Sequence, residues 1–349
     1  MSCTQGDPLC PSPFAQALRF FVSNSRTAFA AVAVVALAVA FPPLAIATDA
    51  GAKPRETQTS DVVTEALRNH VRVLSVEIGE RSVVRGDGLE RAKRYLIETF
   101  RTAGLSVEEQ VYMYEGRPVA NLIADLPGAP ADRAPLLIGA HYDTVVGTPG
   151  ADDNASGVAA MLELARWAIK NRPSAAVRFI AFTLEEPPNF GTRNQGSRVF
   201  VRRLLEEGET IEGAIILEMV GYTTPHQRYP LVLQWAGYPE AGDFIGVVGN
   251  RSSRAFGERI LRAMRRQQTM PVESLFVWLD GRLLPDTRLS DHASFWDEKL
   301  PAVMVTDTAY FRNPHYHRPT DRAETLDYGF MAELVQSLTL VLDEFRETP

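Results

Sequence analysis

The 349-residue chain contains only two cysteines, and both lie near its amino terminus. Cys3 and Cys10 precede a long apolar run, so the part of the chain that follows this run has no thiol. A disulfide framework, a cysteine nucleophile and a thiolate metal site are therefore excluded from that part.

The chain also has no excess of basic residues over acidic ones. The chain has 36 lysines and arginines against 43 aspartates and glutamates, which gives a formal net charge of -7. Because proteins that bind nucleic acids bring Lys and Arg to the phosphate backbone, this balance predicts no nucleic-acid partner. With 45% hydrophobic and 23% charged residues, the composition is typical of a folded protein with one large domain or two modest ones.

One long hydrophobic run is present, at residues 28–41, and it contains only Ala, Val, Leu and Phe. Arg19 and Arg26 precede it, and Ala45-Ile46-Ala47 supplies the small residues of a cleavage site. This pattern predicts that residues 1–47 form a secretory signal peptide. Counted on to Ala47, the apolar length approaches the ~20 residues that a membrane span needs, so an uncleaved anchor through residues 28–47 is the alternative.

Either alternative exports the rest of the chain, so we expect a periplasmic or extracellular protein that is secreted or membrane-anchored. Residues 48–60 are polar, include Pro54 and lack periodicity, which indicates a linker. No second linker of this kind follows, so we expect a single domain at 61–349.

Apolar runs and helical spacing alternate through this domain. Strand-like runs occur at 106–113, 119–126, 136–140, 176–184, 214–219, 244–248, 272–278 and 302–305. Helical apolar spacing occurs at 62–73, 89–100, 158–169, 196–205, 253–265 and 334–345. This alternation predicts an α/β fold with a largely parallel sheet, whose functional site lies beyond the carboxyl ends of the strands.

Polar side chains stand where two of these elements meet. His141 follows the run 136–140, and Asp143 lies on the same side of the chain if it stays extended. Asp143 can then accept a hydrogen bond from one imidazole nitrogen while the other binds a metal. Asp152-Asp153-Asn154 follow in a turn before a helix. N-capping accounts for one polar residue there but not for three in a row, so we expect one of the two carboxylates to bridge two metal ions.

Two further strand ends carry carboxylates. Glu185 and Glu186 follow the run 176–184, and adjacent carboxylates repel unless cations compensate them. This favours divided roles, with one glutamate on a metal and the other acting as a general base toward water. Glu218 closes an apolar run, where a metal would offset the cost of burying its charge.

Two histidines, His315 and His317, lie in a Pro-bracketed loop after the run 302–305. We expect one of them to complete the ligand set. Three other histidines have ordinary interpretations: His70 and His226 are expected to be solvated, and His292 is expected to cap a helix or brace the pocket rather than bind a metal.

In combination, five motifs of the chain resemble those of a known family. They are H-x-D, D-D-N-A-S-G, E-E, L-E-M and Y-H-x-x-x-D. From Val119 to Tyr328 the chain resembles the dinuclear zinc exopeptidases of the aminopeptidase Y and glutamate carboxypeptidase type, family 28 of the metallopeptidases. The resemblance implies a mixed, mostly parallel β-sheet between layers of helices, and two zinc ions as cofactors, with other divalent ions as alternatives.

The resemblance also implies a role for each candidate residue. It places His141, Asp153 and Glu218 on one zinc, and Asp153, Glu186 and His317 on the other. Glu185 would be the general base, and Asp143 and Asp321 would support the ligands. The chain departs from better-known aminopeptidases in two places: Pro187-Pro188 replaces a small Gly-containing turn after the glutamate pair, and Glu218 stands where many relatives have aspartate.

The function implied is that of an exported zinc-dependent exopeptidase, most simply an aminopeptidase that removes N-terminal residues from peptides with a bridging hydroxide and Glu185 as general base. Two alternatives stay open on the same fold. One is a glutaminyl cyclase-like acyltransferase, which would use one zinc, and the other is a non-catalytic binding ectodomain, which would have lost metal ligands.

Overall fold

The computed structural model describes residues 57–128, 133–173 and 175–345. The expected signal peptide or anchor at 1–47 lies outside these residues. Within the described ranges, no helix is both long enough and apolar enough to cross a membrane. Helix α3 (Thr57–Arg72) begins inside the segment 48–60 that the sequence indicates as a linker.

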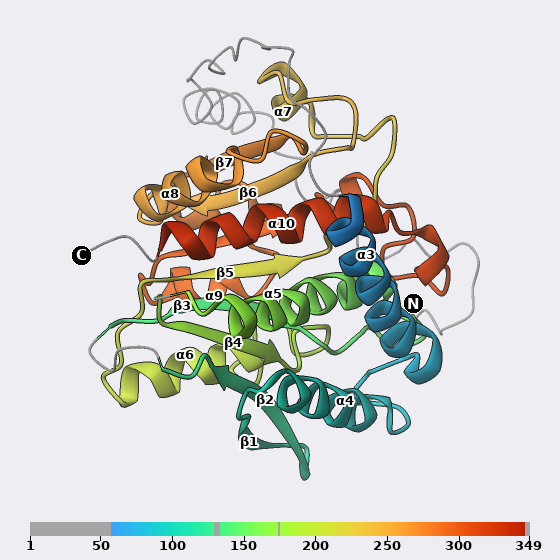
Figure 1. Cartoon of the computed structure of the whole chain (residues 1–349), viewed down its shortest axis with the longest axis vertical. Helices are drawn as coiled ribbons and strands as arrows, with labels where there is room; N and C mark the ends of the chain where they lie inside the picture. Colours follow the sequence, from blue (N-terminus) through green and yellow to red (C-terminus); the bar gives the residue numbers. More distant parts are fainter. Residues whose placement is uncertain (1–56, 129–132, 174, 346–349) are drawn as a thin grey trace, which may run out of the picture. The chain divides into compact units, whose positions relative to one another are not determined.

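A mixed eight-stranded sheet forms the centre of the fold, in the order β1-β2-β4-β3-β5-β8-β6-β7 (Figure 1). Its strands are β1 (Glu108–Tyr114), β2 (Arg117–Asp125), β3 (Leu136–His141), β4 (Val177–Phe182), β5 (Gly213–Glu218), β6 (Ile245–Asn250), β7 (Val272–Val277) and β8 (Ala302–Thr306). Strand β3 runs parallel to both β4 and β5, and β5 runs parallel to β8. The α/β fold with a mixed, mostly parallel sheet is therefore confirmed.

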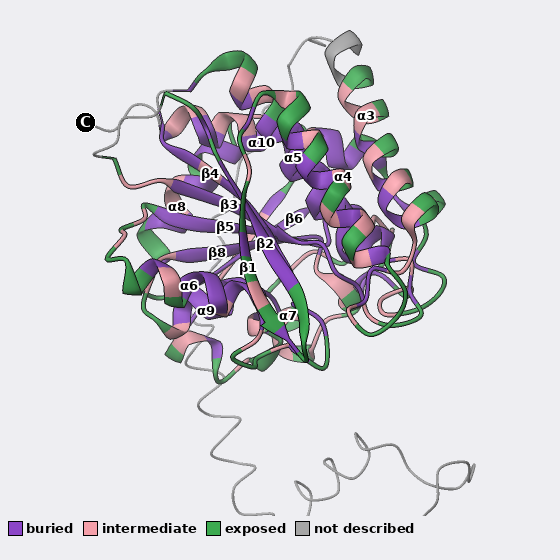
Figure 2. Ribbon diagram, turned by 90° about the horizontal axis from the view of Figure 1, so that it is seen from below, coloured by how far each residue is buried: buried purple, intermediate pink, exposed green. Residues whose placement is uncertain are grey.

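Helices cover both faces of this sheet (Figure 2). One face packs against α3 together with α4 (Gly88–Ala103), α5 (Gly157–Asn171), α8 (Arg254–Met264) and α10 (Tyr328–Glu344). The other packs against α6 (Gly196–Glu206) and α9 (His292–Asp297). Along β3, Leu136 and Ile138 join the first core and Leu137 joins the second, because successive strand residues point to opposite faces. A strand buried on both sides is thus apolar throughout, as its sequence indicates.

Residues 230–237 belong to a separate unit of the chain from the body that contains the sheet. They include a short helix, α7 (Leu231–Trp235), which begins directly after Pro230. The sequence indicates only loops in this stretch, because a single helical turn is too short to produce a periodic apolar pattern.

Candidate metal centre

The candidate ligands meet at one edge of the sheet. His141 is the last residue of β3, Glu218 is the last residue of β5, and Glu185 and Glu186 follow β4 after two residues. Because these three strands are parallel, their carboxyl ends lie side by side. The segment after β8 brings His317 to the same place, so the structure gathers residues that are far apart in sequence.

Asp153 lies between the two imidazoles. Its Oδ1 is 3.3 Å from Nε2 of His141, and its Oδ2 is 3.1 Å from Nε2 of His317. Glu218 approaches the first imidazole, with Oε2 3.5 Å from the same Nε2 of His141, and Glu186 approaches the second, with Oε2 3.3 Å from Nε2 of His317. Two groups of three candidate ligands therefore share one aspartate.

These separations fit the edges of metal coordination polyhedra. Ligand atoms bound tetrahedrally to zinc at about 2.0–2.1 Å stand about 3.3–3.4 Å apart, which follows from the geometry of the tetrahedron. His141 is 1% exposed, and neither of its ring nitrogens has a hydrogen-bond partner within the described structure. Buried polar atoms without partners are rare and costly, so a cation is the group this arrangement fits.

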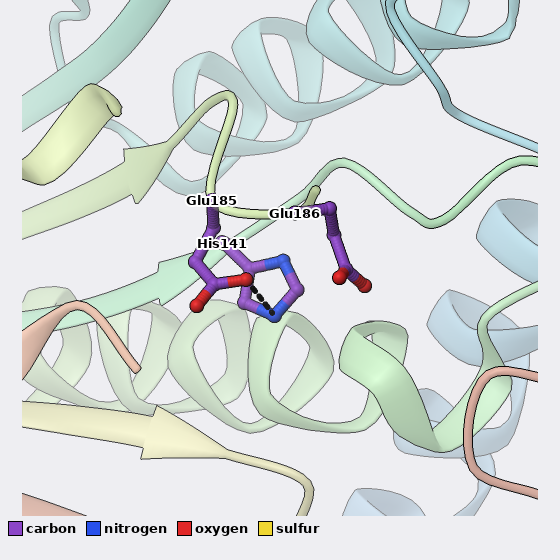
Figure 3. Close-up of side chains that lie close together, drawn as sticks. All are labelled: His141, Glu185 and Glu186. Atoms are coloured by element: carbon purple, nitrogen blue, oxygen red, sulfur yellow. Dashed lines mark ion pairs between the residues drawn. The ribbon is translucent and has the colours of Figure 1, made fainter. Parts of the chain in front are cut away.

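A third possible group joins His141 with Glu185 and Glu186 (Figure 3). In Figure 3 the carboxylate of Glu185 points to the imidazole, but its Oε2 is 3.9 Å from Nε2, farther than the carboxylates of either group that contains Asp153. Glu185 thus faces the centre without completing either of those two groups.

Burial and mutual repulsion shift the acid–base properties of the cluster. Burial, followed by the nearby charge of Asp153, raises the pKa of Glu186 to about 8. Burial alone would lower the pKa of His317, but its hydrogen bonds to Asp153 and Glu186 raise that pKa to about 10. Protons held in this way occupy the positions that a divalent cation would take, since metal ligands must release their protons to bind.

Asp143 supports the glutamate pair more directly than the sequence indicates. Its two carboxylate oxygens accept hydrogen bonds from the backbone N–H groups of Glu185 and Glu186, both at 3.1 Å. Its Oδ1 is 3.5 Å from Nδ1 of His141, which is an electrostatic contact and too long for a good hydrogen bond. Asp143 therefore fixes the backbone that presents both glutamates.

Asp321 fixes the backbone of the turn that carries Asp153. It accepts the N–H of Asp152 at 2.9 Å and the N–H of Asp153 at 3.1 Å. Asp152 points away from the centre, and its carboxylate accepts hydrogen bonds from the N–H of Gly221 and the side chain of Asn313. The two adjacent aspartates are thus separated by their hydrogen bonds, and only Asp153 reaches both imidazoles.

Several supporting residues are missed by sequence reasoning. Ser290 donates a hydrogen bond to Oε2 of Glu218 at 2.7 Å. Asn154 donates to the carbonyl of Leu217 and accepts the N–H of Met219, which ties the aspartate turn to the end of β5. A serine or an asparagine gives no distinctive sequence signal, because these contacts join residues more than 60 positions apart.

The remaining histidines lie outside the cluster. His315 is hydrogen-bonded to Thr320 at 3.0 Å. His292 contacts the carbonyl of Thr287 and meets the ring of Trp296 edge-on, so it braces α9. The expectation that His70 is solvated is wrong: it contacts the hydroxyl of Tyr95 and the carboxylate of Glu163, because α3 packs over α4 and α5.

An open pocket lies over the candidate metal centre. It encloses about 390 Å³ of empty space, part of which is open solvent. Its lining consists of Asp153, Glu185, Glu186, Pro187, Phe190, Glu218, Leu289, Tyr316 and His317. Tyr316 stacks on the ring of His317, with centroids 3.7 Å apart and planes at 20°. The lining of the pocket therefore combines carboxylates with apolar and aromatic side chains.

Buried carboxylates, two imidazoles and an adjoining pocket define the site of a metal-dependent hydrolase. The model of Peptidase family M28 matches residues 121–341, and the chain belongs to this family. The protein is accordingly a metallopeptidase.

The chain is also similar to individual proteins of known sequence. Uncharacterized protein YfbL of Escherichia coli (strain K12) is 37% identical over 290 residues, which cover 80% of this chain and 87% of that protein. A probable leucine aminopeptidase of Arthroderma otae is 23% identical over 243 residues, 66% of this chain and 58% of that protein. The chain thus spans less than two thirds of the length of this fungal relative.

Two solved structures share the fold. The LapA aminopeptidase of Legionella pneumophila has a TM-score of 0.64 and 18% identity, covering 88% of this chain and 80% of that one. A glutaminyl cyclase of Porphyromonas gingivalis has a TM-score of 0.58 and 19% identity, and the match covers 82% of this chain and 98% of that one. At these identities the likeness shows the fold alone, so it does not separate a peptidase from a cyclase.

Proposed function

We propose that this metallopeptidase is an exported, zinc-dependent aminopeptidase that removes N-terminal residues from peptides. The observation that carries the proposal is the position of Asp153, whose two oxygens face the imidazoles of His141 and His317. A carboxylate in that position is suited to bridge two cations, with Glu218 completing one ligand group and Glu186 the other.

Zinc bound there would polarise the scissile carbonyl and lower the pKa of water toward about 7, which supplies the nucleophile near neutral pH. The protein contributes the proton transfer. Glu185 faces the centre, and burial is the main cause that raises the pKa of its carboxyl group well above the usual value. It is positioned to take a proton from the attacking water and to pass it to the leaving amine.

The charge of the pocket favours a substrate with a free amine. Four of its lining residues are carboxylates, and its lining includes no Lys or Arg that could pair with the C-terminal carboxylate of a peptide. A carboxypeptidase needs such a cation, because a buried carboxylate without a partner is costly. Phe190, Leu289 and Tyr316 offer apolar surface to the side chain of the first substrate residue.

Export follows from the sequence at residues 1–47, either through a cleaved signal peptide or with residues 28–47 as a membrane anchor. The proposed location is therefore periplasmic or extracellular, and peptides outside the cytoplasm are the proposed substrates. A glutaminyl cyclase-like acyltransferase is the alternative on this fold. It is less well supported, because the chain keeps a full set of ligands for two ions.

The test compares the zinc-loaded wild-type protein with Glu185→Gln and the control Glu298→Gln, which changes an exposed glutamate. Aminoacyl anilides, C-terminally blocked peptides and peptides with N-terminal glutamine serve as substrates. We expect hydrolysis of the anilides by the wild type and the control, and a loss of about 10²–10⁴-fold in kcat for Glu185→Gln with zinc retained.

Two results would reject parts of this proposal. Release of ammonia from N-terminal glutamine without anilide hydrolysis would favour the cyclase. Undiminished turnover by Glu185→Gln would remove Glu185 from the reaction.

A further inference from the structure

Strand β1 forms one outer edge of the sheet, and within the described residues only β2 pairs with it. The two strands are joined by the two-residue turn Glu115-Gly116, and both turn residues have positive φ. In such a hairpin the residues that flank the turn, Tyr114 and Arg117, form a hydrogen-bonded pair. Alternate residues of β1 therefore direct their N–H and C=O groups toward β2.

The other residues of β1, Glu109, Val111 and Met113, direct their backbone N–H and C=O groups away from β2. Their side chains share one face of the sheet. Val111 is 57% exposed and Met113 is 62% exposed. The outer edge thus combines free backbone donors and acceptors with exposed apolar side chains.

Natural proteins protect such edges with Pro, Lys or a bulge, since an unprotected edge pairs with other strands. Strand β1 has the sequence Glu-Glu-Gln-Val-Tyr-Met-Tyr, which contains neither Pro nor Lys, and its pairing with β2 is continuous. Lys93 contacts the carboxylates of both Glu90 and Glu109, at 3.0 and 3.3 Å, so a single positive charge is shared by two negative ones and Glu109 stays acidic. None of these protections is present on the strand itself.

We propose that β1 is a homodimer interface, at which two copies of the chain pair their β1 strands antiparallel and join their sheets. The register follows from the position of Val111 at the centre of the outward-facing set. A two-fold axis there places Val111 opposite Val111 of the second copy and Glu109 opposite Met113.

The distribution of charge favours a second copy in this register. Antiparallel pairing about Val111 keeps the acidic end of each strand, Glu108-Glu109, opposite the uncharged end, Met113-Tyr114. A shift that centres the pair on Glu109 would set two glutamates directly opposite each other, and like charges in that position are destabilising. The register centred on Val111 avoids this repulsion and uses all three outward-facing residues of each strand.

Disulfide trapping tests this register in the full-length chain, purified in detergent, with Cys3→Ser and Cys10→Ser as background. Residues in a hydrogen-bonded antiparallel pair have Cα atoms about 5.5 Å apart, which is within disulfide range. We expect mild oxidation to convert Val111→Cys to a covalent dimer. Glu109→Cys and Met113→Cys should each form no disulfide-linked dimer alone, and should form one when the two variants are mixed.

Val62→Cys is the matched control, because Val62 is 60% exposed on α3, away from β1. Cross-linking of Val111→Cys no faster than that of Val62→Cys would overturn the proposal. So would cross-linking of all four variants to the same extent, which indicates random collision.

A second pair of variants tests the backbone hydrogen bonds. Val111→Pro removes an outward N–H that β2 does not use, whereas Val111→Thr keeps the N–H and the branched shape. We expect the Thr variant to have the mass of a dimer by light scattering, the Pro variant to have that of a monomer, and both to keep peptidase activity. Equal masses for the two variants would contradict the interface.

Discussion

Replacing Arg81 by methionine should be among the most destabilising single changes in this protein. Arg81 is fully buried, and its guanidinium donates hydrogen bonds only to backbone carbonyls among the described residues. The acceptors are Leu74, Gly79, Tyr142, Pro149 and Gly150, at 2.8–3.2 Å. One arginine thus joins the helical segment Val73–Ile78, which follows α3, to the segment between His141 and Asp153.

The magnitude follows from these contacts. Each hydrogen bond contributes about 1 kcal/mol net, and a carbonyl left buried without a donor costs about 1–3 kcal/mol. Methionine keeps much of the side-chain volume of Arg81, so little cavity forms. Burial lowers the pKa of Arg81 to about 10, so burying its charge is costly, and removal of the charge offsets part of the loss. Together these effects predict a loss of about 3–5 kcal/mol, or on the order of 10 °C in Tm.

Thermal unfolding of the zinc-loaded protein, followed by circular dichroism, measures this loss. Arg85→Met is the control, because the Arg85 side chain is 68% exposed and should change stability by less than about 0.5 kcal/mol. Arg81→Lys should fall between the wild type and Arg81→Met, since lysine keeps the charge but cannot reach all five carbonyls. A loss of less than about 1 kcal/mol for Arg81→Met would refute this reasoning.

Two further predictions concern Asp143 and His292. Asp143→Asn should weaken zinc binding by about 10–100-fold, because the substitution disturbs the backbone that presents Glu185 and Glu186. A chelator competition measures this affinity, and an unchanged value would contradict the role of Asp143. Burial lowers the pKa of His292 to about 4 from 6.5, so its neutral form is favoured by folding. The free energy of unfolding should therefore fall by about 3 kcal/mol as the pH drops from 6.5 to 4, and His292→Gln should lose this part of the pH dependence in urea titrations.

The centre of the sheet could be predicted from the sequence because β3, β4, β5 and β8 each carry a distinct apolar run. Leu136–His141 is buried at every position, and its run stops at a histidine that needs a polar partner. The same pattern at β4 and β5 indicated which carboxylates would meet. Strand ends could therefore be predicted well, since burial in a parallel sheet leaves a clear signal.

Contacts between distant segments could not be predicted in the same way. The pattern alone left Asp152 and Asp153 equivalent, and likewise His315 and His317, because each pair has the same chemistry. Hydrogen bonds separate them in the structure: Gly221 and Asn313 hold Asp152 away, and Thr320 holds His315. Arg81 gave no signal at all, since its partners are backbone carbonyls, which every residue has.

The central claim is that Asp153 bridges two cations. Anomalous diffraction at the zinc absorption edge, from crystals of the full-length protein grown with zinc, tests this claim most directly. The account predicts two peaks, one between His141 and Glu218 and the other between His317 and Glu186, with one oxygen of Asp153 on each. A single peak, or two peaks that do not share Asp153, would contradict it.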